Sequence, residues 1–158
     1  MVNIRTANPD DAPALAKLRY QFRSTTGSDV ENDSDFLSRC EEWMREHLQQ
    51  TNWRCWVVEE GQKIVGALWL QLIEKIPNPT SEPEFHGYIT NVFVDEAMRG
   101  QGIGSRLVDE AISFCKQKPV HAVILWPSER SRSLYERHGF TVRTDLLELL
   151  MSDLEEDL

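Results

Sequence analysis

Cysteine is scarce in this sequence, and its spacing argues against a disulfide framework. Cys40, Cys55 and Cys115 are the only three among 158 residues, and no two of them form a C-x-x-C pair. An odd and dispersed set of this kind is typical of a reducing compartment. No spacing of His, Cys and Asp indicates a metal site either, so we expect no metal.

Long apolar runs are also missing. No stretch approaches the roughly 18 apolar residues of a membrane-spanning helix. The run from Met1 to Arg5 does not resemble a signal peptide. We therefore expect a cytoplasmic protein without a membrane partner.

Basic residues are outnumbered by acidic ones. The 17 Lys and Arg face 26 Asp and Glu, which gives a formal net charge of -9. Nucleic acids and anionic membranes need a basic surface, so neither is expected as a partner. The acidic excess favours solubility and leaves room for a local basic pocket.

Apolar residues are plentiful enough for one core. They make up 41% of the 158 residues, which suits a single globular domain. No repeat, low-complexity tract or linker divides the chain. We place the domain at residues 1–151 and an acidic tail at residues 152–158.

The first half of the chain predicts two helices and then antiparallel strands. Asn8-Pro9-Asp10-Asp11 is a strong helix start, and Thr25 to Ser28 should end that helix. In chain order we expect a strand at 2–7, the first helix, a second helix at 34–49, a β-hairpin of 53–60 and 63–73, a proline-rich loop at 77–83 and a strand at 85–95.

The second half alternates strand and helix. A Gly-rich turn at 99–104 leads into a helix, and an apolar strand follows at 120–126, which implies a parallel pair with a right-handed crossover. A short helix should end at Gly139, and strands at 140–142 and 146–151 should close the sheet. The expected fold is an α/β domain of the α+β kind, with a mixed, mostly antiparallel sheet and about four helices.

The turn between strand and helix is the most informative segment. It reads Arg99-Gly100-Gln101-Gly102-Ile103-Gly104-Ser105, directly after the strand ending Val92-Phe93-Val94. Glycines let a ligand approach the main chain closely, and the free N–H groups of a first helical turn bind anions. A diphosphate fits such a site.

Two common phosphate-binding motifs fit this turn poorly. A P-loop needs Lys after its last Gly, and here Ser105-Arg106 follows Gly104. A dinucleotide site needs G-x-G-x-x-G and an acid about 20 residues on; the last Gly is missing and the region near Ile124 is apolar.

The turn resembles the R-x-x-G-x-G pyrophosphate loop of the GNAT superfamily of N-acetyltransferases. The run from Ser133 to Phe140 is similar to the L-Y-E-x-x-G-F block of that family, and the order of elements is similar over nearly the whole chain. The resemblance implies transfer of an acetyl group from acetyl-CoA to a primary amine, by direct attack in a ternary complex.

The same resemblance implies roles for individual residues. The amides of the loop would hold the pyrophosphate of CoA, and pantetheine would lie against the strand before it, which usually carries a bulge. Ser128 stands where the family often has Asn, and Ser131 stands where a small residue faces CoA. The implied CoA-binding residues are Val92, Phe93, Val94, Arg99, Gly100, Gln101, Gly102, Ile103, Gly104, Ser105, Ser128, Ser131 and Tyr135.

The same resemblance suggests which residues transfer protons. Tyr135 matches the tyrosine that protonates the departing thiolate, and such a donor eases departure of the thiol. Glu84 and His86 alternate on the expected fourth strand and are candidates for the base, directly or through water. Alternatively, both residues are polar side chains at the edge of a strand close to a loop, without a role in the reaction.

The acceptor is not identified by the sequence. Its pocket should lie between the first two helices, the 77–83 loop and the fourth strand, with Arg19, Tyr20, Arg23 and Trp43 as candidate lining residues. Members of the family often dimerise, so the resemblance also implies a homodimer. The alternative function is a non-catalytic acyl-CoA-binding sensor or regulatory module, and a nucleotide-phosphate enzyme is disfavoured by the missing Lys and acid.

Overall fold

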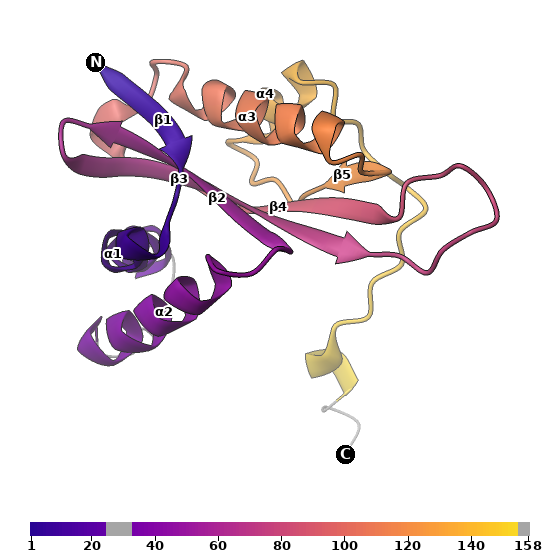
Figure 1. Ribbon diagram of the computed structural model, residues 1–158, viewed down its shortest axis with the longest axis horizontal. Helices are drawn as coiled ribbons and strands as arrows, with labels where there is room; N and C mark the ends of the chain where they lie inside the picture. Colours follow the sequence, from indigo (N-terminus) through magenta and orange to yellow (C-terminus); the bar gives the residue numbers. More distant parts are fainter. Residues whose placement is uncertain (25–32, 155–158) are drawn as a thin grey trace.

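A single sheet forms the centre of the computed structural model, which describes residues 1–24 and 33–154 (Figure 1). The sheet has five strands in the order β1-β2-β3-β4-β5. Their bounds are β1 Val2–Thr6, β2 Trp53–Glu60, β3 Lys63–Glu74, β4 Phe85–Val94 and β5 Ala122–Ile124. All neighbours are antiparallel except β4 and β5, which are parallel as expected.

Two helices cover one face of this sheet. A short 3-10 turn, Pro9–Asp11, is capped by Asn8 in a complete capping box and leads into α1, Ala12–Ser24. The second helix, α2, spans Asp33–His47. The predicted helix break at Thr25 to Ser28 lies outside the described residues.

The opposite face carries α3, Ile103–Gln117, and the short α4, Arg132–Arg137 (Figure 1). A 3-10 turn, Glu96–Met98, joins β4 to the loop before α3. Among the described residues, no helix has both the length and the apolar character that a membrane crossing requires.

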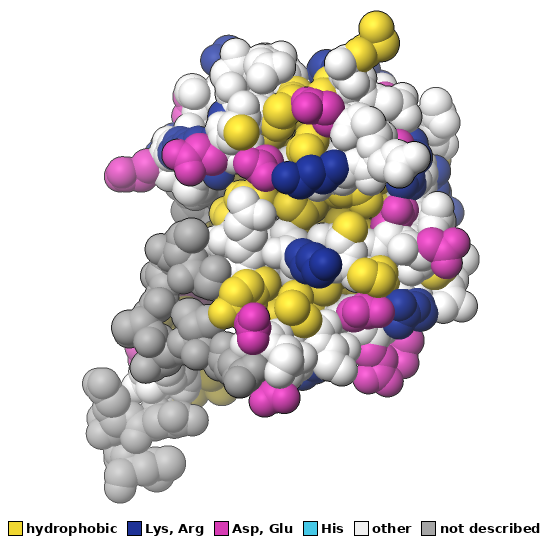
Figure 2. All heavy atoms as spheres, turned by 90° about the vertical axis from the view of Figure 1, so that its left-hand side faces the viewer, with side chains coloured by type: hydrophobic (Ala, Val, Ile, Leu, Met, Phe, Trp, Pro, Cys, Tyr) yellow, Lys and Arg dark blue, Asp and Glu magenta, His cyan; other side chains and the backbone are white. Residues whose placement is uncertain are grey.

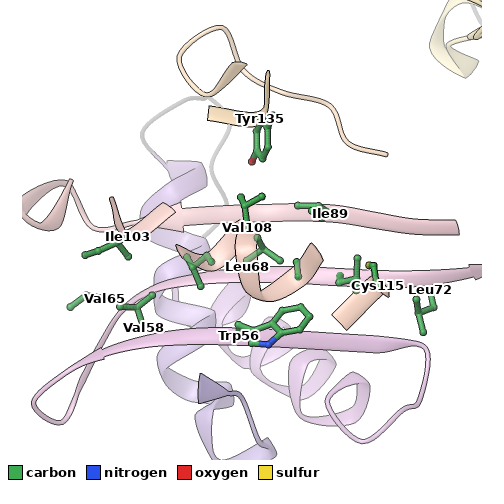
Figure 3. Packing of buried hydrophobic residues seen from close by; sticks show 13 residues of the cluster. Trp56, Val58, Val65, Leu68, Leu72, Ile89, Ile103, Val108, Cys115 and Tyr135 are labelled. Carbon is green, nitrogen blue, oxygen red and sulfur yellow. The ribbon is translucent and has the colours of Figure 1, made fainter. Parts of the chain in front are cut away.

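Hydrophobic side chains fill the space on both sides of the sheet. On the α3 face Leu68 and Leu70 of β3 belong to the same buried cluster as Leu107 and Val108 of α3 (Figure 3). On the other face α1 and α2 bury a second cluster, which includes Leu15, Met44 and Trp69. The sheet is therefore a middle layer between two pairs of helices.

The end of the sheet differs from the sequence-based expectation. No strand follows Ile124 among the described residues, so the predicted strands at 140–142 and 146–151 are wrong. The chain instead passes β5 and leaves the body, and its described part ends with a 3-10 turn at Met151–Leu154 (Figure 1). Apolar composition predicted strands there, but Phe140 packs against the core as an irregular residue, the side chains at 141–142 and 146–151 are exposed, and no described strand pairs with either segment.

The α3 helix depends on its buried face, which allows a direct test. Leu107 is fully buried in the cluster between α3 and the sheet. We expect Leu107→Ala to lower the free energy of unfolding by about 2–5 kcal/mol, measured by denaturant titration, because it removes buried methyl groups and leaves a cavity. The same kind of truncation at exposed Ile76, as Ile76→Ala, should change it by less than about 0.5 kcal/mol. Equal effects of the two changes would contradict this packing.

Candidate functional site

A cleft of about 820 Å³ opens where β4 and β5 separate. The two strands pair only from His86, Gly87 and Tyr88 to Ala122, Val123 and Ile124. Beyond that point β4 continues to Val94, while the chain after Ile124 turns toward α4. Leu125 and Trp126 therefore lose the ladder that the apolar run at 120–126 predicted, and they line the cleft instead.

The cleft lies toward the start of α3. Figure 2 looks at the molecule from the left-hand side of Figure 1, where the loop before α3 lies. Hydrophobic side chains are visible there in hollows between rims of charged side chains. A ligand in this region would find apolar walls inside and charge at the border.

A β-bulge shapes the β4 wall of the cleft. The register with β3 shifts so that Asn91 and Val92 together stand opposite Leu68. Asn91 has a φ of 53°, in the left-handed region that Asn tolerates better than most residues. Val92, Phe93 and Val94 follow the bulge and line the cleft, where the resemblance expects pantetheine.

The loop before α3 supplies main-chain donors. Gly102 caps α3 in the left-handed region, with a φ of 76°, and no side chain caps the helix. The amide of Arg106 bonds back to the Gly102 oxygen at 3.1 Å, so the amides just before it belong to the uncapped first turn. With the helix dipole, this turn is suited to an anion.

Three arginines that line the cleft bring positive charge close to this loop. Arg99 donates from Nε to the Val94 oxygen at 2.9 Å and stacks over Phe93, which fixes the loop on β4. Arg130 and Arg137, which the sequence analysis missed, also line the cleft. Arg106 is exposed and does not line it.

Two serines stabilise the start of α4. The Oγ atoms of Ser128 and Ser131 lie 2.8 Å apart, and each Oγ also accepts from the other residue's amide, at 3.0 and 3.2 Å. Both serines line the cleft. Their hydroxyls are therefore already committed to holding the turn that presents α4.

Tyr135 of α4 reaches the cleft from above the sheet. Its side chain hangs from α4 with the hydroxyl directed toward β4 (Figure 3). The residue is 6% exposed, and burial raises the pKa of its phenol above the ordinary value. The phenol therefore keeps its proton at neutral pH and is available as a donor.

His138, at the end of α4, holds α4 against α3. Its Nδ1 donates to the Leu134 oxygen at 2.8 Å, while Nε2 lies 3.2 Å from Ser105 Oγ and 3.0 Å from Asp109 Oδ1. Ser105 thus links the turn at the start of α3 to α4. This link was not visible in the sequence, because it joins side chains 33 residues apart.

The two candidate bases lie elsewhere. His86 pairs with Ala122 near the other end of the β4–β5 ladder, and neither His86 nor Glu84 lines the cleft. Burial lowers the pKa of His86, and the positive charge of Lys75 lowers it further. Gln101 is exposed and also does not line the cleft, although the other predicted CoA-binding residues do.

A smaller cavity of about 290 Å³ adjoins the cleft between α1, α2 and the sheet. Arg19, Thr90 and Asn91 line both spaces, so the two spaces share a border. The other residues around the smaller cavity are Phe36, Cys40, Trp43, Met44, Trp53 and Trp69.

The expected acceptor pocket is partly in this place. Arg19 and Trp43 line the smaller cavity and Arg23 lines the cleft. Tyr20 packs against Phe36 and lines neither space, and the 77–83 loop lines neither. Trp53 and Trp69 were not predicted as lining residues, because an aromatic residue within a predicted strand is most simply interpreted as part of the core.

The chain is similar to a known family of enzymes over most of its length. Residues 20–140 match the model of the acetyltransferase (GNAT) family. A protein of Mycobacterium tuberculosis described as a probable N-acetyltransferase is 26% identical over 150 residues, covering 89% of this chain and 80% of that protein. A glucosamine 6-phosphate N-acetyltransferase of Trypanosoma brucei brucei is 35% identical over 78 residues, covering 49% of this chain and 51% of that protein.

A solved structure extends the similarity to the whole fold. A predicted acetyltransferase from Clostridium acetobutylicum, crystallised with acetyl-CoA, superposes with a TM-score of 0.83 at 25% identity. The match covers 97% of this chain and 98% of that one.

Gly104 offers a test of the turn as an anion site. Gly102 would be strained by any side chain because of its positive φ, whereas Gly104 is helical and a Cβ there would meet only Leu134 at 3.4 Å. We expect Gly104→Val to weaken acetyl-CoA binding about 10-fold or more, measured by calorimetry, because the side chain fills space lining the cleft.

The matched control is Ser113→Val, on an exposed position of the same helix. It should leave both acetyl-CoA affinity and the thermal midpoint nearly unchanged. Normal acetyl-CoA binding by a folded Gly104→Val protein would remove this turn from the site.

Proposed function

We propose that this chain, which belongs to the acetyltransferase (GNAT) family, moves an acetyl group from acetyl-CoA to a primary amine bound in the cleft between β4 and α4. Membership and the relatives named as N-acetyltransferases make the chain an N-acetyltransferase. The acceptor and the roles of single residues form the proposal. The observation that carries it is the uncapped α3 turn beside the open part of β4.

The residues around the cleft fit acetyl-CoA. Diphosphate would be held by the first amides of α3, with Arg130 and Arg137 close by, because amides and cations both favour an anion. Pantetheine would lie along Val92 to Val94, where β4 still pairs with β3 but has no described strand on its β5 side. Acetyl-CoA, when bound, supplies a thioester whose carbonyl carbon can accept an amine.

Tyr135 is the proposed proton donor. The new C–N bond forms as the C–S bond breaks, and the electron pair goes to sulfur, which takes a proton from the Tyr135 phenol. Because burial raises the pKa of that phenol, the proton is still present at neutral pH. Tyr135 regains a proton from water, since its hydroxyl faces a cleft open to solvent.

The amine's own proton is proposed to leave to water. No Asp, Glu or His lines the cleft among the described residues, whereas Arg19, Arg23, Arg99, Arg130 and Arg137 do. Nearby cations lower the pKa of a bound ammonium, so the neutral amine is favoured without a side-chain base. Direct proton transfer to Glu84 or His86 is not part of this proposal, because neither lines the cleft.

Nothing favours the alternative of a non-catalytic acyl-CoA sensor. Such a module would need the acyl-CoA site alone, yet Tyr135 is presented to the cleft and a second cavity adjoins it. An enzyme uses both features, one for the leaving group and one for the acceptor.

We also propose that the chain forms a homodimer through its C-terminal segment, residues 142–154. That segment exposes large hydrophobic side chains, of which Leu147 is 98% exposed. They are Val142, Leu146, Leu147, Leu149, Leu150, Met151 and Leu154. A concentration of apolar surface on one segment usually marks an interface, and the outer edge of β5 is also unpaired among the described residues.

Replacing Tyr135 by Phe tests the acid. We expect Tyr135→Phe to lower kcat by about 10-fold to 10⁴-fold, because only the phenolic hydroxyl that carries the donated proton is removed, with little change in acetyl-CoA affinity. Initial rates of thiol release and calorimetry measure the two quantities. Tyr20→Phe makes the same chemical change at a residue that lines neither cavity and should leave kcat intact. An unchanged kcat in Tyr135→Phe would remove Tyr135 from the reaction.

Charge placed on the C-terminal segment tests the dimer. Light scattering after gel filtration should give a dimer mass for the wild type and a monomer mass for the double variant Leu147→Glu, Leu150→Glu, since burying two carboxylates in an apolar interface is costly. Ile76→Glu adds charge at an exposed apolar residue outside the segment and should leave the dimer intact. A monomeric wild type would contradict the proposal.

A further inference from the structure

The residues that separate the two cavities indicate which kind of acceptor would fit. Thr90 and Asn91, at the β4 bulge, and Arg19 of α1 line the cleft and the smaller cavity together. A molecule in the smaller cavity would therefore face the cleft across these three residues. Any group meant to react must project across that border.

The smaller cavity is walled by aromatic rings. Trp43 meets Trp53 edge-on at 5.1 Å and lies tilted to Trp69 at 5.7 Å, and Phe36 completes the set. The buried indole N–H of Trp69 has no acceptor among the described residues. Rings held at these distances favour an apolar or flat group.

Arg19 is the charged residue at the border. Its Nη1 donates to Asn91 Oδ1 at 2.9 Å, a neutral partner, and no ion pair with a described carboxylate involves it. Burial lowers the pKa of this guanidinium, and the charge of Arg23 lowers it further. A guanidinium that is half-buried beside another cation gains most from an anionic ligand.

This arrangement argues against several amines. A polyamine or other polycation would meet Arg19 at the border and no carboxylate, because no Asp or Glu lines either cavity in the described part of the chain. A cationic side chain in the aromatic cavity would also hold its nitrogen away from the cleft and close to Arg19. A sugar would find few hydrogen-bonding groups along the tryptophans.

We propose that the acceptor is a free α-amino acid with an aromatic side chain. Its carboxylate pairs with Arg19, its ring enters the cavity formed by Phe36, Trp43, Trp53 and Trp69, and its α-amine projects into the cleft. The inference rests on the proposed function and adds the chemical class of the acceptor.

The bonds formed and broken are the same as in the general reaction proposed above. The α-nitrogen forms an amide bond to the acetyl carbon, the C–S bond breaks, and free thiol leaves with one proton. The ammonium releases its proton to water, and the products are an N-acetyl amino acid and CoA. The Arg19 pair also offsets the carboxylate that would otherwise raise the pKa of the adjacent amine.

A panel of matched amines tests the class. Thiol release should give a kcat/KM for L-phenylalanine about 10-fold or more above 2-phenylethylamine, which lacks the carboxylate, and above L-alanine, which lacks the ring. L-Phenylalaninamide should resemble 2-phenylethylamine. Equal values for all four, or preference for a polyamine or an amino sugar, would overturn the inference.

Variants at the border supply the second arm. Arg19→Gln should reduce the ratio of kcat/KM for L-phenylalanine over 2-phenylethylamine about 10-fold, because only the first ligand carries the anion. Lys17→Gln removes the same charge from an exposed position of α1 that lines neither cavity, and it should leave the ratio unchanged. Trp43→Ala should reduce the ratio for L-phenylalanine over L-alanine.

A measurement of amino acid binding without reaction tests the acceptor class separately from the proposed acetyltransferase activity. Calorimetry of L-phenylalanine into protein saturated with CoA should show binding in the wild type and a loss of about 10-fold in Arg19→Gln. If some other amine is acetylated while L-phenylalanine neither binds nor reacts, the acceptor class is wrong and the transferase stands. If acetyl-CoA binds and no amine in a broad panel releases thiol, the proposed function itself fails.

Discussion

The separation of β4 from β5 is the constraint on which the site depends. Main-chain polar groups inside a sheet must normally be paired, and a strand that loses its neighbour exposes a row of them. Here the ladder stops after Tyr88 and Ile124, and β4 then continues for six residues toward the α3 turn. The fold therefore contains an unfilled strand position, and an extended ligand such as pantetheine can occupy it.

The elements around this gap are placed to serve it. The bulge at Asn91 turns β4 and brings a left-handed residue to the border of both cavities. Arg99 ties the following loop back to Val94, so the uncapped start of α3 lies directly after the open part of β4. His138 joins α4 to α3 through Ser105 and Asp109, which fixes the helix that carries Tyr135. The proposed anion site, the extended groove and the proposed proton donor are thus parts of one connected structure.

Sequence patterns predicted those parts that depend on neighbouring residues. The helix start at Asn8, the hairpin of β2 and β3 and the Gly-rich turn before α3 all follow from local chemistry, and the structure shows each of them. The closing strands at 140–142 and 146–151 failed, because a strand needs an available edge and composition alone does not provide one. Arg130, Arg137 and the tryptophan cavity were missed for a related reason: their roles come from which elements meet. Asn91 carried a usable signal, since Asn within an apolar strand is a candidate for a left-handed bulge.

The central claim is that open main chain of β4 and the first turn of α3 together hold the acyl-CoA. Amide chemical shifts in a ¹H–¹⁵N titration with acetyl-CoA test it most directly, because each amide reports separately. We expect the largest changes at residues 92–94 and 102–105, with little change at the far end of α3 near Lys118. Large changes confined to the β1 edge or to α2, with residues 92–94 and 102–105 unmoved, would contradict it.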